Sequence, residues 1–169
     1  MLVTAAASAV GTLALQYAKA GGASRVVAAV SSADKAEFVR ALGADEVVLY
    51  ADTSWGDPVD VVVDGVGGNS SARGACPGPG GRLVAFSSGG GEIDAYELLV
   101  RSASVIGFQM AAIARAGPRC TRVGSTSCGN STAHARCAPR VRSHPLAEAA
   151  RAHEIIESRR NLGKVVLIP

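Results

Sequence analysis

The sequence predicts an α/β protein built on a doubly wound parallel sheet. Strand-like and helix-like segments alternate over the first half of the chain, and the strand-like segments are rich in Val. Runs such as residues 61–63 are apolar without alternation, which is typical of strands covered on both faces in a parallel sheet. With 169 residues, 48% of them hydrophobic, the chain is long enough for one domain with its own core.

The expected strands are short apolar or β-branched segments that lie between turn residues. They comprise residues 2–5, 25–30, 46–49, 59–63, 82–86 and 104–108. Two helices are expected between the first three strands, at 10–20 and 33–42. Gly21 and Gly43 are suitable C-terminal stops, and Ser32 is a suitable N-cap for the second helix. This alternation implies right-handed crossovers between parallel strands.

The regular order ends near residue 114. Residues 114–143 have no apolar period, and a structureless segment of that length is unusual inside a compact domain. Regularity returns at Pro145, which suits the first turn of a helix expected to end near residue 159. A last strand is expected at 164–168. We therefore divide the chain into residues 1–113, 114–143 and 144–169.

The composition of the irregular segment suggests a reading-frame error. Residues 111–147 contain no Asp or Glu but six Arg. A reverse translation of residues 117–139 with GC-rich codons, shifted by two bases, encodes acidic and aromatic residues and the helix-like stretch VDELWQLY. A sequencing error or compensating insertions and deletions would explain this, and a genuine divergent loop is the alternative.

The charge distribution argues against a nucleic-acid partner. The formal net charge is +3, but outside the acid-free segment eleven basic residues face fourteen acidic ones. The basic excess is thus a property of one segment, which is weak evidence for nucleic-acid binding. No apolar run is long enough to span a membrane, so no membrane partner is expected. The first 20 residues resemble a signal peptide but lack a positive n-region, so we expect a cytoplasmic protein.

Residues 2–11 predict a strand, a turn of small residues and the start of a helix. Small residues at such a turn allow the backbone to approach a pyrophosphate at the positive end of the helix dipole, as in Rossmann-type folds. The pattern G-x-G-x-x-G is absent, so a tight connection without a ligand is the alternative.

Several ordered motifs then resemble one family. They are Asp34–Lys35, residues 42–45, residues 64–68, residues 80–84 and residues 161–166. With the turn, they resemble the quinone-oxidoreductase branch of the medium-chain dehydrogenase/reductase family, over residues 2–109 and 145–169. The family's turn pattern A-x-x-G-x-x-G falls on Ala5, Ser8 and Gly11, and Ser8 departs from it, which predicts a less close approach to the pyrophosphate.

The residues after the second expected strand favour NADPH. NAD-specific folds have a carboxylate there for the ribose 2′-hydroxyl, whereas Ser31, Ser32 and Lys35 suit a 2′-phosphate. Asp34 is assigned to the first turn of the next helix, and a solvated helix charge is the alternative for Lys35. The resemblance adds Tyr50 against the cofactor. The expected cofactor-binding residues are Ala5, Ser8, Ala9, Val10, Gly11, Ser31, Ser32, Lys35, Tyr50, Val66, Gly67, Gly68, Phe86 and Ser87.

Family members carry an N-terminal catalytic domain of GroES-like barrel type, which we expect to be absent here. Its absence would expose an apolar face on the C-terminal helix and strand that normally pack on it. The residues expected on this face are Leu146, Ala149, Ala150, Ile155 and Ile156. No residue is a clear acid, base or nucleophile, so the catalytic residues are unknown. We interpret His144 and His153 as surface residues.

No metal site is expected. Cys120, Cys128, Cys137 and His134 could supply ligands, but their spacing matches neither structural zinc sites nor the family's zinc lobe.

The sequence thus favours the cofactor-binding portion of an NADPH-dependent quinone oxidoreductase or enone/enoyl reductase. The partner would be a small electron acceptor, either a quinone or an enone. The alternatives are a truncated NADPH-binding module without turnover and a non-functional gene remnant, so enzyme activity stays open. We also expect a homodimer that pairs the strand at 104–108 across a two-fold axis, with a monomer as the alternative.

Overall fold

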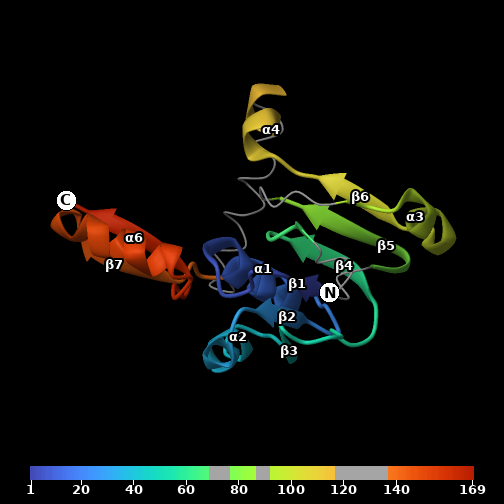
Figure 1. Cartoon of the computed structure of the whole chain (residues 1–169), viewed down its shortest axis with the longest axis horizontal. Coiled ribbons are helices and arrows are strands. Elements are labelled where there is room, and N and C mark those ends of the chain that lie inside the picture. Colours follow the sequence, from blue (N-terminus) through green and yellow to red (C-terminus); the bar gives the residue numbers. More distant parts are fainter. Residues whose placement is uncertain (69–76, 87–91, 117–136) are drawn as a thin grey trace.

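The computed structural model describes residues 1–68, 77–86, 92–116 and 137–169 (Figure 1). The strands of its main sheet are β1 (Leu2–Val3), β2 (Val27–Val30), β3 (Glu46–Leu49), β4 (Val59–Asp64), β5 (Pro77–Ala85) and β6 (Ser104–Gly107). Within the described residues they form one sheet in the order β3-β2-β1-β4-β5-β6, and every neighbouring pair is parallel. The predicted fold class is confirmed.

Helices lie between some of these strands and after the last of them. They are α1 (Ala9–Ala20), the 3₁₀ turn η1 (Ala33–Lys35), α2 (Ala36–Arg40), α3 (Ala95–Arg101) and α4 (Met110–Ala116). None of the helices in these parts of the chain is long and apolar enough to cross a membrane.

The region after β2 differs from its prediction. A 3₁₀ turn precedes the helix, so α2 covers only the middle of the predicted range 33–42. Ser32 has an extended backbone, and its side chain makes no capping hydrogen bond. Ser32 therefore holds the predicted N-cap position, at the start of the 3₁₀ turn, but without a capping hydrogen bond from its side chain.

Helices α3 and α4 were not expected from the sequence. Asp94 caps α3, since its side chain accepts a hydrogen bond from the Tyr96 N–H at 2.8 Å. Tyr96, Leu99 and Val100 share one face of this short helix, but no residue of α3 is buried. The strand β5 also begins five residues earlier than predicted, at Pro77 rather than Arg82. Its pairing with β4 shifts in register between these two residues.

The sheet buries apolar side chains on both faces. One core joins alternate residues of β1 and β2 to the helices α1 and α2: Val3, Leu15, Ala28, Val30 and Val39. The other joins the remaining strand residues to the segment after β3 and to β5: Leu2, Val27, Ala29, Trp55, Val62 and Leu83. Burial of both faces explains why the central strands are continuously apolar.

The C-terminal part forms a second, two-stranded parallel sheet. The strands β7 (Val141–Pro145) and β8 (Lys164–Ile168) pair along their whole length. The 3₁₀ turn η3 (Leu146–Glu148) and the helix α6 (Ala149–Glu157) connect them. In Figure 1, β7 and α6 lie together at one end of the molecule, beyond α1.

This sheet corrects two expectations. Residues 141–143 are not irregular, because main-chain pairing with β8 makes them a strand despite their lack of an apolar period. Pro145 is the last residue of β7 and not the first turn of a helix, which begins later and ends at Glu157. Residues 117–136 of the predicted irregular segment lie outside the described residues.

The side chains around α6 agree with the sequence only in part. Leu146, Ala150 and Ile156 are exposed as predicted, whereas Ala149 and Ile155 are partly covered. His153 is exposed as expected.

His144 is buried, so its interpretation as a surface residue is wrong. It lies in the paired strand β7, and its Nδ1 is 3.7 Å from the Glu148 carboxylate at the start of the following helix. The other residues of β7 pair with β8 in the same way but stay exposed, so pairing alone does not explain the burial of His144.

Gly11 determines how closely α1 approaches the turn after β1. A Cβ atom at this position would lie 2.2 Å from the Ala5 carbonyl oxygen and 2.7 Å from the Ala6 Cα. Both contacts are to backbone, which cannot move aside as a flexible side chain would. The third glycine of dinucleotide-binding turns serves the same close helix–strand packing.

We predict that Gly11→Ala lowers the free energy of unfolding by about 1–3 kcal/mol, the range for overpacking a tight site. Gly107→Ala is the matched control, since a Cβ there meets nothing within 4 Å, and it should change stability by less than about 0.5 kcal/mol. Urea denaturation of both variants measures the difference. Equal stabilities would show that the helix does not need this close approach.

Candidate functional site

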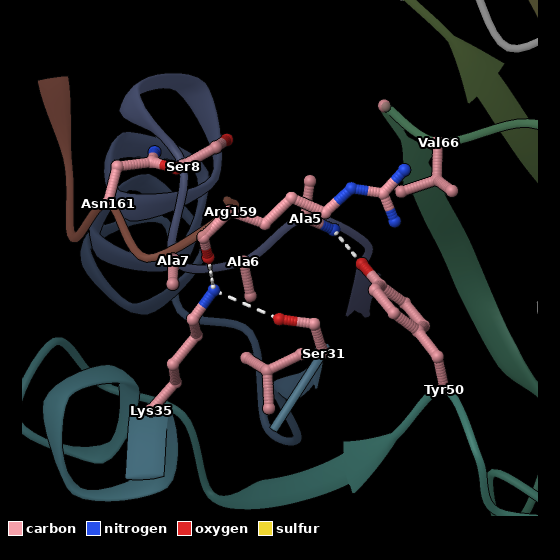
Figure 2. Close-up of a pocket in the computed structure, with 12 residues that line it drawn as sticks. Ala5, Ala6, Ala7, Ser8, Ser31, Lys35, Tyr50, Val66, Arg159 and Asn161 are labelled. Atoms are coloured by element: carbon pink, nitrogen blue, oxygen red, sulfur yellow. Dashed lines mark hydrogen bonds between the residues drawn. The ribbon is translucent and has the colours of Figure 1, made fainter. Parts of the chain in front are cut away.

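A cavity of about 330 Å³ opens at the carboxyl ends of the central strands (Figure 2). Its walls come from the segments that follow β1, β2, β3 and β4, together with the segment between α6 and β8. The strand order reverses between β1 and β4, and ligands of open α/β sheets bind at such a switch point. The volume is typical of small-molecule sites.

Six of the fourteen predicted cofactor-binding residues line this cavity: Ala5, Ser8, Ser31, Lys35, Tyr50 and Val66. Seven others are described but are not among its lining residues: Ala9, Val10, Gly11, Ser32, Gly67, Gly68 and Phe86. Ser87 lies outside the described residues. Arg159 and Asn161 line the cavity without having been predicted as site residues.

The turn after β1 has an unusual backbone at its first residue. Ala5 has a φ of +46°, in the left-handed region that non-glycine residues rarely occupy. Its N–H donates a hydrogen bond of 2.6 Å to the Tyr50 hydroxyl, which in turn donates to the Ala29 carbonyl at 3.3 Å. Tyr50 therefore links the carboxyl ends of three neighbouring strands and supports the strained turn. Burial raises the pKa of the Tyr50 hydroxyl.

The N-terminus of α1 faces this turn. Ser8 is its N-cap, and the hydroxyl accepts a hydrogen bond of 3.1 Å from the Gly11 N–H. The departure of Ser8 from the family's glycine thus has a structural role in the cap. Ala9 and Val10 form the first turn of the helix, where the positive end of the helix dipole favours an anion.

Lys35 is a buried cation at the other side of the cavity. Its Nζ donates hydrogen bonds to the Ser31 hydroxyl at 2.9 Å and to the Arg159 carbonyl oxygen at 2.5 Å. The side chain is not a solvated surface charge, because only 7% of the residue is exposed. Burial lowers the pKa of the ammonium group; the charge of Asp34 opposes this shift and that of Arg159 adds to it.

The C-terminal segment completes the wall. The Gly163 N–H donates a 2.7 Å hydrogen bond to the Ala7 carbonyl, and Gly163 also forms an isolated bridge with Ser8. Figure 2 shows the Arg159 side chain reaching past Ala5 toward Tyr50 and Val66. The sequence feature that could have pointed to Arg159 is the pair of basic residues at 159–160, shortly before Gly163 and β8. The sequence could not show which element these side chains face.

The segment after β4 forms the remaining side. Gly65 and Val66 line the cavity, and Gly67 and Gly68 have positive φ angles of 68° and 65°. A Cβ at Gly65 would lie 2.5 Å from the ring of Phe86, so Phe86 packs against the turn and does not line the cavity.

Comparison with known proteins identifies the family. Residues 9–119, more than half of the chain, match the family described as zinc-binding dehydrogenase. The chain belongs to this family. The predicted resemblance to the quinone-oxidoreductase branch is confirmed, since relatives with that name match the whole length of the chain.

Quinone oxidoreductase 1 of Escherichia coli is 30% identical over 99% of this chain and 56% of its own length. A solved structure of an E. coli quinone oxidoreductase complexed with NADPH has a TM-score of 0.81 at 30% identity, again covering 99% of this chain and 56% of the other. A Pseudomonas syringae quinone oxidoreductase gives a TM-score of 0.83 at 28% identity, with the same coverage of both chains. The chain thus spans about half the length of these relatives.

The family's description raises the question of zinc. Over the ranges that the structure describes, no three His, Cys, Asp or Glu side chains group together in a way that could hold a metal ion. Cys120, Cys128 and His134 lie outside those ranges, and Cys137 is buried.

The raised pKa of Tyr50 predicts a pH-dependent contribution to stability. Folding favours the neutral form of the Tyr50 hydroxyl, so this group adds to the free energy of unfolding. The full contribution is present below the ordinary tyrosine pKa near 10, and it is lost as the pH rises through the higher pKa of the folded state. Tyr50→Phe should therefore cost about 1 kcal/mol at pH 8, from the lost hydrogen bond to Ala5, and the difference from wild type should narrow above pH 10. Urea unfolding at pH 8 to 11 measures it. A constant difference would contradict the burial of this hydroxyl.

Proposed function

We propose that this chain binds NADPH in the cavity and acts as the cofactor-binding part of an NADPH-dependent oxidoreductase. The observation that carries the proposal is the buried Lys35 ammonium just after β2, which lines the cavity and donates a hydrogen bond to the Ser31 hydroxyl. The family relatives whose solved structures contain NADPH support the same cofactor.

The residues around the cavity fit a cofactor with a 2′-phosphate. Lys35 supplies positive charge and Ser31 a hydroxyl on the same side of the cavity, and the two together suit a phosphate. None of the described residues that line the cavity is Asp or Glu. An NAD-specific site would need a carboxylate at the end of β2 for the ribose hydroxyl. The polar groups therefore favour NADPH over NADH.

The turn after β1 fits the diphosphate of such a cofactor. Its residues Ala5 to Ser8 are small and line the cavity. The N-terminus of α1 lies directly behind them and favours a negative charge. Ser8 holds this helix end in place through its cap, while Ala9, Val10 and Gly11 support the turn from outside the cavity.

NADPH, when bound, supplies the hydride that reduces the acceptor. The task of this chain is to hold and orient the cofactor, since positioning contributes much of the rate in direct hydride transfer. The quinone oxidoreductase relatives support a quinone as acceptor, and an enone stays the alternative. A cytoplasmic location also stays a prediction.

Replacement of Lys35 tests the cofactor. We expect the chain to bind NADPH more tightly than NADH, and Lys35→Ala to weaken NADPH binding by about 1–2 kcal/mol, the scale of a charge-assisted hydrogen bond. The affinity for NADH should change little, because NADH has no 2′-phosphate. Fluorescence titration with both nucleotides measures the effect.

Lys19→Ala is the matched control for this experiment. Lys19 lies in the last turn of α1, away from the cavity, where it pairs with Asp45 at 2.7 Å. This variant should keep the preference for NADPH. If wild type binds both nucleotides equally, or if Lys35→Ala and Lys19→Ala behave alike, the assignment of the 2′-phosphate to Lys35 is wrong.

We also propose that the chain forms a homodimer through β6. Among the described residues this strand is the edge of the main sheet. Ile106 within the strand is 46% exposed, and Phe108 directly after it is 40% exposed. An exposed edge with apolar side chains can pair with the same edge of a second copy across a two-fold axis.

The dimer is tested by Ile106→Lys, which should convert it to a monomer in multi-angle light scattering because a charge is buried in the interface. Val141→Lys is the control, since Val141 is also an exposed strand residue but lies in the other sheet. A monomeric wild type, or a dimer that tolerates the Ile106 change, would remove this proposal.

A further inference from the structure

A buried hydroxyl and a buried carboxylate meet where the strand order reverses. Thr4 directly follows β1, and Asp64 is the last residue of the adjacent strand β4. The Thr4 hydroxyl donates a hydrogen bond of 2.6 Å to Asp64 Oδ1. Thr4 is 0% exposed and Asp64 is 5% exposed. The two side chains join the bases of the two turns that border the cavity at this point.

The same two side chains bind the backbone of the turn after β4. The Gly65 N–H donates to the Thr4 hydroxyl at 2.8 Å. The Asp64 carboxylate accepts from the Val66 N–H at 3.0 Å and from the Gly67 N–H at 3.2 Å. Three successive N–H groups of this turn are therefore held by Thr4 and Asp64, which determines the path of the turn beside the cavity.

Burying a carboxylate costs free energy that an apolar pair of similar volume would avoid. Neither side chain lines the cavity, so neither is placed to touch a ligand. Their hydrogen bonds fix the position of Gly65 and Val66, which do line it. In Figure 2, Val66 lies across the cavity from Lys35 and Ser31.

We infer that Thr4 and Asp64 are positioning residues for the half of NADPH that lies beyond its adenosine 2′-phosphate. They act through the turn at residues 65–67, which they hold at a fixed distance from the turn after β1. This inference rests on the proposed function, since it concerns how the cavity holds that cofactor. It predicts that loss of the Thr4 hydroxyl weakens binding of the nicotinamide half of NADPH but leaves binding of the adenosine 2′-phosphate half unchanged.

Two ligands make it possible to test the two ends of the cavity separately. Adenosine 2′,5′-bisphosphate carries the 2′-phosphate but lacks the nicotinamide half, whereas NADPH has both. In Thr4→Val we expect about a tenfold weaker binding of NADPH, the scale of a lost hydrogen bond to a charged group, and bisphosphate binding within about twofold of wild type. Isothermal titration calorimetry on the full chain measures both affinities.

Thr4→Ser is the matched variant. It keeps the hydroxyl but removes a buried methyl group, so it should lower the melting temperature and still restore NADPH binding to near the wild-type value. A purely structural role of Thr4 predicts the opposite, namely that NADPH affinity falls in step with stability in both variants. If Thr4→Val does not fold, Asp64→Asn replaces it, with the same expected split between the two ligands.

The outcomes are distinct from those of the proposed function. If the wild-type chain does not bind the bisphosphate, the proposed NADPH site fails and this inference fails with it. If wild type binds both ligands and the Thr4→Val or Asp64→Asn change weakens both in parallel, the site stands and the positioning role is overturned. A Thr4→Ser variant that loses NADPH as strongly as Thr4→Val also overturns it.

Discussion

The close approach of helix α1 to the turn after β1 is the constraint on which the cavity depends. Gly11 has no side chain, so the helix lies against the Ala5 and Ala6 backbone. Its N-terminus therefore points into the space at the ends of the strands, where its dipole favours an anion. The left-handed Ala5 and the hydrogen bond from Ala5 to Tyr50 follow from the same tight turn.

Segments far apart in the sequence then complete the cavity. The Lys35 ammonium binds the carbonyl of Arg159, 124 residues later, and Gly163 bonds to the turn at Ala7. The C-terminal segment is thus part of the wall of the site, although its own strands belong to a separate sheet. The Lys35 charge after β2 gives its side of the cavity a preference for phosphate.

Local patterns made much of the fold predictable from the sequence. The strands at Glu46–Leu49 and Lys164–Ile168 have the predicted bounds because their β-branched runs stand between turn residues. The strand β7 was missed since non-local pairing with β8, not its own composition, stabilises it. In the same way, Lys35 was found from its place after β2, whereas Arg159 and the Thr4–Asp64 contact depend on long-range packing that no local pattern encodes.

A crystal structure of this chain with NADPH tests the central claim most directly. We expect density for the 2′-phosphate within hydrogen-bonding distance of Ser31 or Lys35, and density for the diphosphate beside the turn from Ala5 to Ser8. A nucleotide bound elsewhere, or bound with its adenosine away from Lys35, would contradict it.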